Sequence, residues 1–316
     1  MKCSDYTVGW ICAVHVEYVV AAGMLDEEHD DQMQPLTEWD DENSYTFGRI
    51  GPHNVVITCL PIGKYGIAAA AVAATHMKRS FKCIRMGLMV GIGGGVPSKN
   101  HDVRLGDIVI GACAGLTGSV LDYDHGKVMP DGKLQLTKHT DKPPSVLLNA
   151  LSKLRRDHEL RGNMIVSYIK DMMEKNRLLQ SERRYNRPPP EEDRLYETSY
   201  QHVNEDLRCA ECCEPRLVNR GRSRMNPDNP VVHYGRIASA SKLMKDARYR
   251  DQMADEHEVL CFEMEAAGLD DFHCLIIRGI CDYADSHKND TWQGYAAAAA
   301  AGYAKELLHA IPSKAI

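Results

Sequence analysis

The sequence predicts an α/β fold, because strand-like and helix-like segments alternate along most of the chain. Within this alternation, Ile84–Val90 is a nearly continuous apolar run, which suits a strand in the middle of a sheet. The alternation pauses after about residue 143 and resumes at Val231. We therefore expect one domain spanning residues 1–316, with a helical and loop insertion at about 143–232.

The expected elements follow in order from the amino end. Val8–Ala13 is apolar enough for a first strand, and the apolar spacing of His15–Leu25 predicts the helix after it. A Gly-Pro turn separates two strand-like runs, Tyr45–Ile50 and Asn54–Leu60. Further on, we expect helices at 66–79, 147–160, 164–179 and 291–309, and strands at 106–111, 231–238 and 275–282.

Composition is that of an ordinary globular protein. The chain has 316 residues, 44% of them hydrophobic and 26% charged, with a formal net charge of −6. This acidic balance gives no support for nucleic acid or a membrane surface as a partner. The sequence shows no signal peptide core and no apolar run of membrane-spanning length. Most of the eleven cysteines lie in apolar segments, as in reduced cytoplasmic proteins.

Three carboxylates near the carboxyl end are the strongest functional signal. Glu263 and Glu265 flank Met264 in a segment, 261–268, that predicts an acidic helix start. Asp282 ends the apolar strand that follows. A carboxylate inside an apolar run is costly without a partner or a function. Carboxyl ends of strands in α/β enzymes face the ligand crevice, so we expect these groups to share one site.

Three other features are weaker signals. Gly91–Pro97 follows the central strand and predicts either a ligand-binding loop or a plain turn, since its spacing fits neither a dinucleotide fingerprint nor a Walker loop. Lys64 lies in a glycine loop before a helix, where it favours an anion or is simply a surface residue. Glu17 follows the first strand and is either a crevice residue or a solvated helix residue.

A cysteine cluster in the insertion raises the question of a metal. Cys209, Cys212 and Cys213 lie between His202 and His233, but the Cys-x-x-Cys spacing occurs only once. Structural zinc sites usually have a second clean ligand pair. A structural metal and a chance cluster are comparable interpretations, and we include no metal in the predicted site.

Taken together, the segments resemble the nucleoside phosphorylase superfamily. They resemble most the fungal branch whose domains often lie at the amino end of nucleotide-binding repeat receptors. The motifs that carry the resemblance are 45–51, 90–97, 103–107, 233–235, 262–268 and 278–289, and the similarity covers 6–125 and 231–309. The resemblance implies a central mixed sheet, partly curled into a barrel and flanked by helices. It also implies cleavage of N-glycosidic bonds by phosphate or water.

Similarity to the methylthioadenosine/S-adenosylhomocysteine nucleosidases implies specific roles. Asp282 matches the residue that protonates the purine at N7, and Glu17 matches the one that activates water. The resemblance also implies a set of substrate-binding residues. Met264 and Glu265 would bind the ribose, Gly93 and Gly94 would lie near the ribose and the base, and Phe262, Leu243 and Met244 would line the base pocket. Glu263 is included in this set without a specific contact. This chemistry needs no metal and no organic cofactor.

Two departures from the phosphorylases favour water as the nucleophile. Met89 occupies the position where phosphorylases usually have an arginine, and 13–17 lacks their Gly-Asp-Pro-x-Arg motif. The resemblance therefore implies a purine nucleosidase. A purine nucleoside phosphorylase and a non-catalytic nucleotide-binding or self-associating signalling domain remain alternatives.

Several properties stay open at this level. The substrate is a purine nucleoside or nucleotide, and Lys64, Arg104 and the basic run 216–224 are candidate ligands for a 5′-phosphate or simply solvated residues. The resemblance implies a homo-oligomer, with a dimer favoured. The chain is either a stand-alone enzyme or the amino-terminal domain of a longer receptor.

Overall fold

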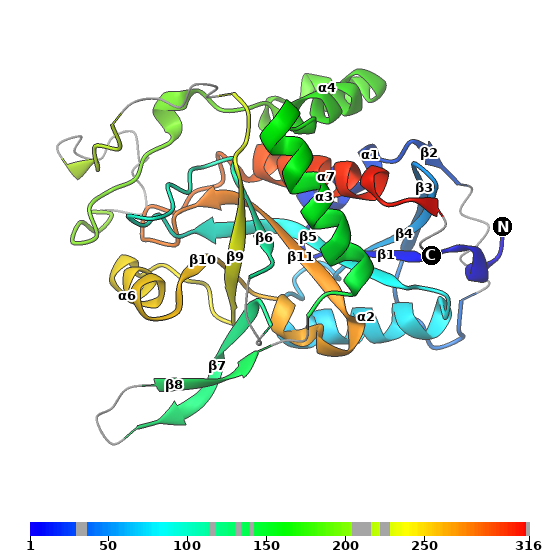
Figure 1. Ribbon diagram of the computed structural model, residues 1–316, viewed down its shortest axis with the longest axis horizontal. Coiled ribbons are helices and arrows are strands. Elements are labelled where there is room, and N and C mark those ends of the chain that lie inside the picture. Colours follow the sequence, from blue (N-terminus) through cyan, green and yellow to red (C-terminus); the bar gives the residue numbers. More distant parts are fainter. Residues whose placement is uncertain are drawn as a thin grey trace.

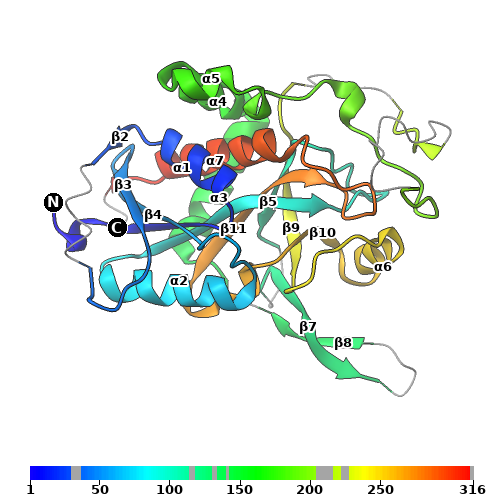
Figure 2. The same cartoon turned by 180° about the vertical axis from the view of Figure 1, so that it is seen from behind.

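A central sheet with helices on both faces dominates the structure (Figures 1 and 2). This computed structural model describes residues 1–29, 37–113, 118–129, 134–139, 142–203, 216–221 and 228–313. The strands are β1 (Val8–Cys12), β2 (Glu27–Glu28), β3 (Tyr45–Ile50), β4 (His53–Cys59), β5 (Met86–Gly95), β6 (Ile108–Gly111), β7 (Val120–Val128), β8 (Leu134–His139), β9 (Val232–Ser239), β10 (Val259–Glu263) and β11 (Cys274–Asp282).

The sheet is mixed and partly closed, as the sequence motifs imply. Its strands follow the order β2-β3-β4-β1-β5-β11-β6-β9-β7-β8. Strands β1, β4, β5 and β11 run parallel to their neighbours in this group, whereas β6 is antiparallel to β11. Strand β10 pairs with both β5 and β9, so β5, β11, β6, β9 and β10 close into a small barrel. The prediction of a mixed, partly barrel-like sheet is confirmed.

Helices cover the two faces of this sheet. They are α1 (His15–Gly23), α2 (Ile67–Ser80), α3 (Ser145–Arg161), α4 (Ile165–Lys175), α5 (Arg177–Ser181), α6 (Ala247–His257) and α7 (Gln293–Ala310). Helix α7 packs directly on β5 and β11 and is itself contacted by α1, α3 and α4, whereas α2 packs on β1 from the opposite face (Figure 1). Helix α7 and strand β11 lie so close together that only a small residue fits between them. A Cβ at Gly279 of β11 would overlap the carbonyl oxygen of Ala296 in α7.

The structure corrects three expectations. The glycine run expected as a loop, 91–95, is the end of β5, because small residues let neighbouring groups approach this strand closely. The acidic helix start expected at 261–268 is the end of β10 followed by a single 3-10 turn, Ala266–Gly268. The helix expected at 164–179 is divided into α4 and α5 at Asn176, whose non-helical backbone, with φ of −116° and ψ of 82°, interrupts it.

Elements that were not expected from the sequence include strand β2, the β7–β8 hairpin, strand β10 and helix α6. The hairpin projects from the body in both views (Figures 1 and 2). The cluster Cys209, Cys212 and Cys213 lies outside the described residues. In the described ranges no group of three or more His, Cys, Asp or Glu side chains is arranged to hold a metal ion. Among the helices described, none is both long and apolar enough to cross a membrane.

Candidate functional site

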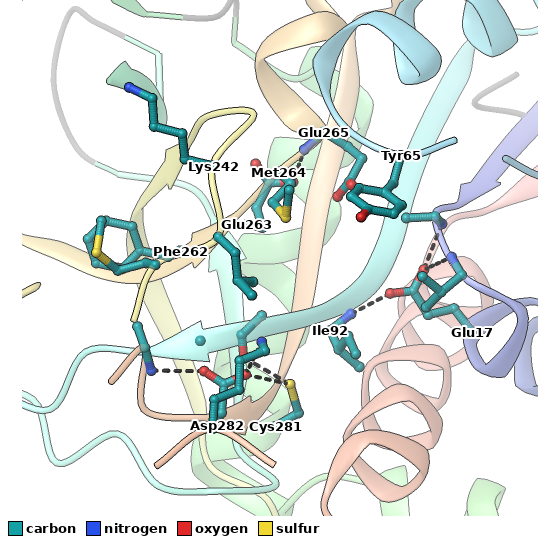
Figure 3. A pocket seen from close by; sticks show the side chains of 18 residues that line it. Glu17, Tyr65, Ile92, Lys242, Phe262, Glu263, Met264, Glu265, Cys281 and Asp282 are labelled. Atoms are coloured by element: carbon teal, nitrogen blue, oxygen red, sulfur yellow. Dashed lines mark hydrogen bonds and ion pairs between the residues drawn. The ribbon is translucent and has the colours of Figure 1, made fainter. Parts of the chain in front are cut away.

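One pocket lies where the carboxyl ends of β1, β5, β10 and β11 meet (Figure 3). Its volume is about 270 Å³. The structure brings every residue of the predicted site to its walls: Glu17, Gly93, Gly94, Leu243, Met244, Phe262, Glu263, Met264, Glu265 and Asp282. These residues come from opposite ends of the chain, and the closed barrel is what places them together.

Glu17 is fixed at one end of the pocket by backbone donors. It lies in the first turn of α1 and is only 3% exposed. Its Oε2 accepts hydrogen bonds from the backbone N–H of Ala13 at 2.7 Å and of Val14 at 3.2 Å, and its Oε1 accepts one from Ile92 at 2.8 Å (Figure 3). Burial raises the pKa of Glu17, although the Arg278 guanidinium and these three donors oppose the shift. The carboxylate is thus held rigidly and is more basic than an exposed one.

Gly91 explains how a strand can run so close to this carboxylate. A Cβ at this position would overlap Oε1 of Glu17 and lie 2.5 Å from Nη1 of Arg278. The glycine run therefore leaves room for buried charged side chains along β5. Gly91 does not have a left-handed backbone conformation. A glycine is needed at this position because the side chains of Glu17 and Arg278 lie where a Cβ would be.

A buried arginine organises the second group of carboxylates. Arg278 in β11 is 0% exposed, and its Nη2 donates to Oε2 of Glu263 and, at 3.5 Å, to Oε2 of Glu265. The Glu263 carboxylate also accepts from the backbone N–H of Glu265 and Ala266 at 3.0 Å. Its oxygens therefore bind protein groups. The sequence analysis missed Arg278, although a charge inside an apolar strand was a signal for a buried partner.

Glu265 is the member of this group that turns toward the pocket. Its Oε1 accepts a hydrogen bond from the backbone N–H of Gly66 at 3.2 Å. Burial raises the pKa of Glu265 to about 7, and the nearby carboxylates of Glu263 and Glu17 act in the same direction, against Arg278. The Glu265 carboxyl can therefore change its charge near neutral pH.

Asp282 lies across the pocket, at the end of β11. Its Oδ1 accepts a hydrogen bond from the backbone N–H of Ala284 at 2.8 Å, and its Oδ2 lies 2.5 Å from Nζ of Lys288 (Figure 3). The left-handed backbone of Ala284, with φ of 52°, turns this N–H back toward the carboxylate. Cys281 Sγ also contacts Oδ2, at 3.2 Å. Lys288 lies in the motif 278–289, in which the family resemblance implied a role for Asp282 alone.

An apolar wall completes the pocket between these charged ends. Phe262 is buried and packs edge-on against Tyr123, with 5.6 Å between ring centroids. Leu243 and Met244 line the same side, and Leu243 is 49% exposed at the mouth. Tyr65, which the sequence analysis did not propose, lines the opposite part of the mouth. An apolar wall with polar groups at its ends suits a flat ring joined to a hydroxyl-bearing group.

The basic residues proposed as phosphate ligands lie elsewhere. Lys64, Arg104 and Arg216 do not line this pocket, and Arg216 pairs with Glu197 at 3.1 Å. Arg220 binds the hydroxyl of Tyr283 and a backbone carbonyl, both at 2.7 Å. The other arginines of the run, Arg222 and Arg224, lie outside the described residues. The cations that do line the pocket are Lys242 and Lys288.

Comparison with known proteins gives one sequence relative and many structural ones. No protein-family model matches the chain. A protein of Hyaloscypha variabilis, described as nucleotide-binding leucine-rich repeat (NLR)-like, is 42% identical over 314 residues. The match covers 99% of this chain and 30% of that protein, so the chain spans less than a third of its relative. This relative fits the predicted fungal receptor branch.

Solved structures with the same architecture include a futalosine hydrolase and 5′-methylthioadenosine/S-adenosylhomocysteine nucleosidases. Futalosine hydrolase of Helicobacter pylori matches with a TM-score of 0.60 at 13% identity, covering 96% of this chain and 97% of that one. The 5′-methylthioadenosine/S-adenosylhomocysteine nucleosidase of Neisseria meningitidis, solved with methylthio-immucillin-A, matches with 0.59 at 17% identity, covering 96% and 98%. The Helicobacter pylori nucleosidase of this kind matches with 0.58 at 12% identity, again covering 96% and 98%. The chain therefore has the fold of the nucleosidases of the nucleoside phosphorylase superfamily, which its sequence motifs resemble.

Proposed function

We propose that the protein is a purine nucleosidase, an N-ribosyl hydrolase that releases the base from a purine nucleoside or nucleotide. One observation carries the proposal. Glu17, Glu265 and Asp282 reach a single pocket from separate parts of the fold, and each carboxylate is held by different partners. Separate environments let three carboxylates take three roles, as base, charge stabiliser and acid.

Glu17 is the general base for water in this proposal. Three backbone donors fix its oxygens, and burial shifts its pKa upward, toward the pH at which a base is most effective. A water molecule beside Glu17 would give up a proton to it while its oxygen attacks C1′ of the ribose. The purine then leaves with the electron pair of the glycosidic bond.

Glu265 and Asp282 act on the two sides of the bond that breaks. The ribose becomes oxocarbenium-like as the base departs, and the Glu265 carboxylate, accepting bonds from the ribose hydroxyls, stabilises that positive charge. Asp282 delivers a proton to N7 of the purine, which makes the base a better leaving group. The apolar wall around Phe262 would hold the purine ring between these two groups.

Water is favoured over phosphate by the charges around Glu17. Of the described residues that line the pocket, Lys242 and Lys288 are the cationic ones, and each is ion-paired, with Asp124 at 3.0 Å and Asp282 at 2.5 Å. A phosphate ion beside Glu17 would instead meet a buried carboxylate, which repels it. This is the structural counterpart of the missing phosphate arginines in the sequence.

A second candidate function is nucleotide binding without turnover. The matched relative is NLR-like, and the chain spans only 30% of it, as expected for one module of a receptor. Turnover separates the two candidates. If the module only binds, Asp282→Asn leaves the biological output of the full-length protein intact, whereas the nucleosidase proposal requires that output to be lost.

We further propose that residues 1–316 form one domain that assembles as a homodimer in the cytoplasm. The exposed apolar residues at the pocket mouth, Tyr65 and Leu243, are where a second copy would complete the site. Light scattering that shows only monomer at all concentrations would refute the assembly.

Product analysis tests the function. The protein is incubated with adenosine, guanosine, inosine, methylthioadenosine, AMP and ATP, with and without phosphate, and free base is measured by chromatography. Base release without phosphate is expected, and the preferred member of the panel identifies the substrate class. Release only with phosphate would make the protein a phosphorylase.

A further inference from the structure

Lys288 makes a contact that the proposed reaction, as described so far, does not use. It lies in the loop between β11 and α7, lines the pocket, and its side chain is only 20% exposed. Its Nζ lies 2.5 Å from Oδ2 of Asp282, the proposed acid (Figure 3). An ammonium in contact with a general acid is a potential source of its proton.

The acid needs such a source. Asp282 delivers one proton to the base in every turnover and must regain one before the next. Its Oδ1 accepts the Ala284 N–H and its Oδ2 contacts Cys281 Sγ at 3.2 Å. Burial opposes the charge of Lys288, but the carboxylate of Asp282, with Cys281 and Asp290, raises the pKa of this lysine, so it carries a proton at neutral pH. Lys288 is thus the loaded donor next to Asp282.

The loop does not depend on this ion pair for its position. Arg250 Nη1 donates to the carbonyl oxygen of Tyr283 at 2.9 Å, and the backbone N–H of His287 donates to Oδ1 of Asp285 at 2.9 Å. Arg220 also binds the Tyr283 hydroxyl, at 2.7 Å. These bonds hold the stretch 283–287, which directly precedes Lys288, and none of them uses the ion pair.

We propose that Lys288 supplies the proton that Asp282 passes to the departing purine, so that the two residues form a proton relay. The inference rests on the proposed nucleosidase function and adds a positioning and proton-supplying residue to it. Lys288 acts through Asp282, and its side chain keeps 20% of its surface exposed, through which it exchanges protons with solvent.

The step balances in protons and electrons. The C1′–N9 bond breaks with its electron pair going to the purine, whose N7 takes a proton from Asp282. Asp282 enters the step as the carboxylate of its ion pair with Lys288 and takes from Nζ the proton that it passes on, which leaves a neutral amine and restores the carboxylate. The attacking water gives a proton to Glu17 as its oxygen bonds to C1′. Solvent then accepts the proton of Glu17 and returns one to Lys288, which restores the enzyme.

Two substitutions separate a relay from a simple clamp. Lys288→Met removes the charge at similar length, whereas Lys288→Arg keeps the charge and the contact with Asp282 but cannot give up a proton in a protein. If Lys288 relays a proton, both variants lose kcat on the preferred purine nucleoside, by about 10²-fold or more, as for the loss of general acid catalysis.

A second substrate tests whether the loss concerns the leaving group. p-Nitrophenyl β-D-ribofuranoside releases nitrophenolate, which leaves without being protonated, so both variants should lose less than about 10-fold on it. Glu17→Gln is the matched control, because it removes the base for water and should impair both substrates equally. Circular dichroism spectra that match wild type establish that the variants are folded.

The outcomes are distinct. Wild-type activity in Lys288→Arg would show that Lys288 only holds Asp282, and equal losses on both substrates would show a general structural role. Either result, or full activity in Lys288→Met, overturns the relay while the nucleosidase proposal stands. Absence of base release by the wild-type protein from every nucleoside and nucleotide would instead overturn the proposed function, and the relay with it.

Discussion

Replacing Arg278 with methionine tests how the carboxylates of the site are kept together. Arg278 is completely buried, and its guanidinium contacts Glu263 and Glu265 while lying near Glu17. Arg278→Met leaves these buried carboxylates without their cation. Removing one partner of a buried ion pair typically costs about 3–5 kcal/mol, because the remaining charge stays desolvated. We expect a loss of that size in the free energy of unfolding at pH 7.5.

The loss should depend on pH in a defined direction. Without the guanidinium, the pKa values of Glu17 and Glu265, which burial already raises, rise further above those in the unfolded chain. The native variant then binds more protons than its unfolded state, so its stability relative to wild type recovers as the pH falls. Urea denaturation followed by circular dichroism at pH 7.5 and 5.5 measures both quantities.

A surface arginine provides the control for this experiment. Arg49 pairs with Glu27 at 2.7 Å, but the two side chains are 49% and 57% exposed. Exposed pairs contribute about 0–1 kcal/mol, so Arg49→Met should be nearly neutral at both pH values. The reasoning is refuted if Arg278→Met costs no more than Arg49→Met, or if its cost is the same at pH 7.5 and 5.5.

Three further predictions concern activity. Gly91→Ala places a methyl group against Glu17, so kcat should fall by about 10²-fold with the fold retained; unchanged kcat would contradict the close approach. Because burial raises the pKa of Glu265 to about 7, the KM for a nucleoside should rise as the pH falls below 7, and Glu265→Gln should remove this dependence. Phe262→Ala should raise KM about 10- to 100-fold, the usual value of base stacking on an aromatic ring, and an unchanged KM would place the base elsewhere.

The architecture was predictable because long elements have strong local signals. Residues 86–90 of the central apolar run and residues 294–308 of the alanine-rich terminal helix are buried, and such segments are recognisable from composition alone. The barrel was implied only by the family resemblance. Its closure depends on β10, a five-residue strand whose partners β5 and β9 are distant in sequence, and no local pattern specifies that pairing.

The glycine run was misread for a related reason. Consecutive glycines usually indicate a turn, because they tolerate left-handed backbone. In β5 the glycines instead make room for side chains from other elements, such as Glu17 and Arg278 at Gly91. Tertiary contacts of this kind override the preference of consecutive glycines for turns. The spacing of the glycines in the sequence does not reveal these contacts.

In the site, too, residues with a local sequence signal were predicted, whereas residues that depend on tertiary contacts were not. Asp282 and Glu17 were identified because they match motif positions at the ends of strands, and the structure brings both to one pocket. Arg278 and Lys288 were overlooked because their importance comes from what they contact. One sits inside an apolar strand and the other in a polar loop, and only the folded chain places each against a carboxylate. Contact partners of the proposed site residues are therefore harder to predict than those residues themselves.

The central claim is that Asp282 and water cleave a glycosidic bond in this pocket. Its most direct test is the stoichiometry of free purine and reducing sugar released in phosphate-free buffer by wild type and by Asp282→Asn, with equal folding verified by circular dichroism. The account predicts one base for each sugar from wild type and a loss of about 10²-fold or more in the variant. Equal rates from the two proteins, or base release that requires phosphate, would contradict it.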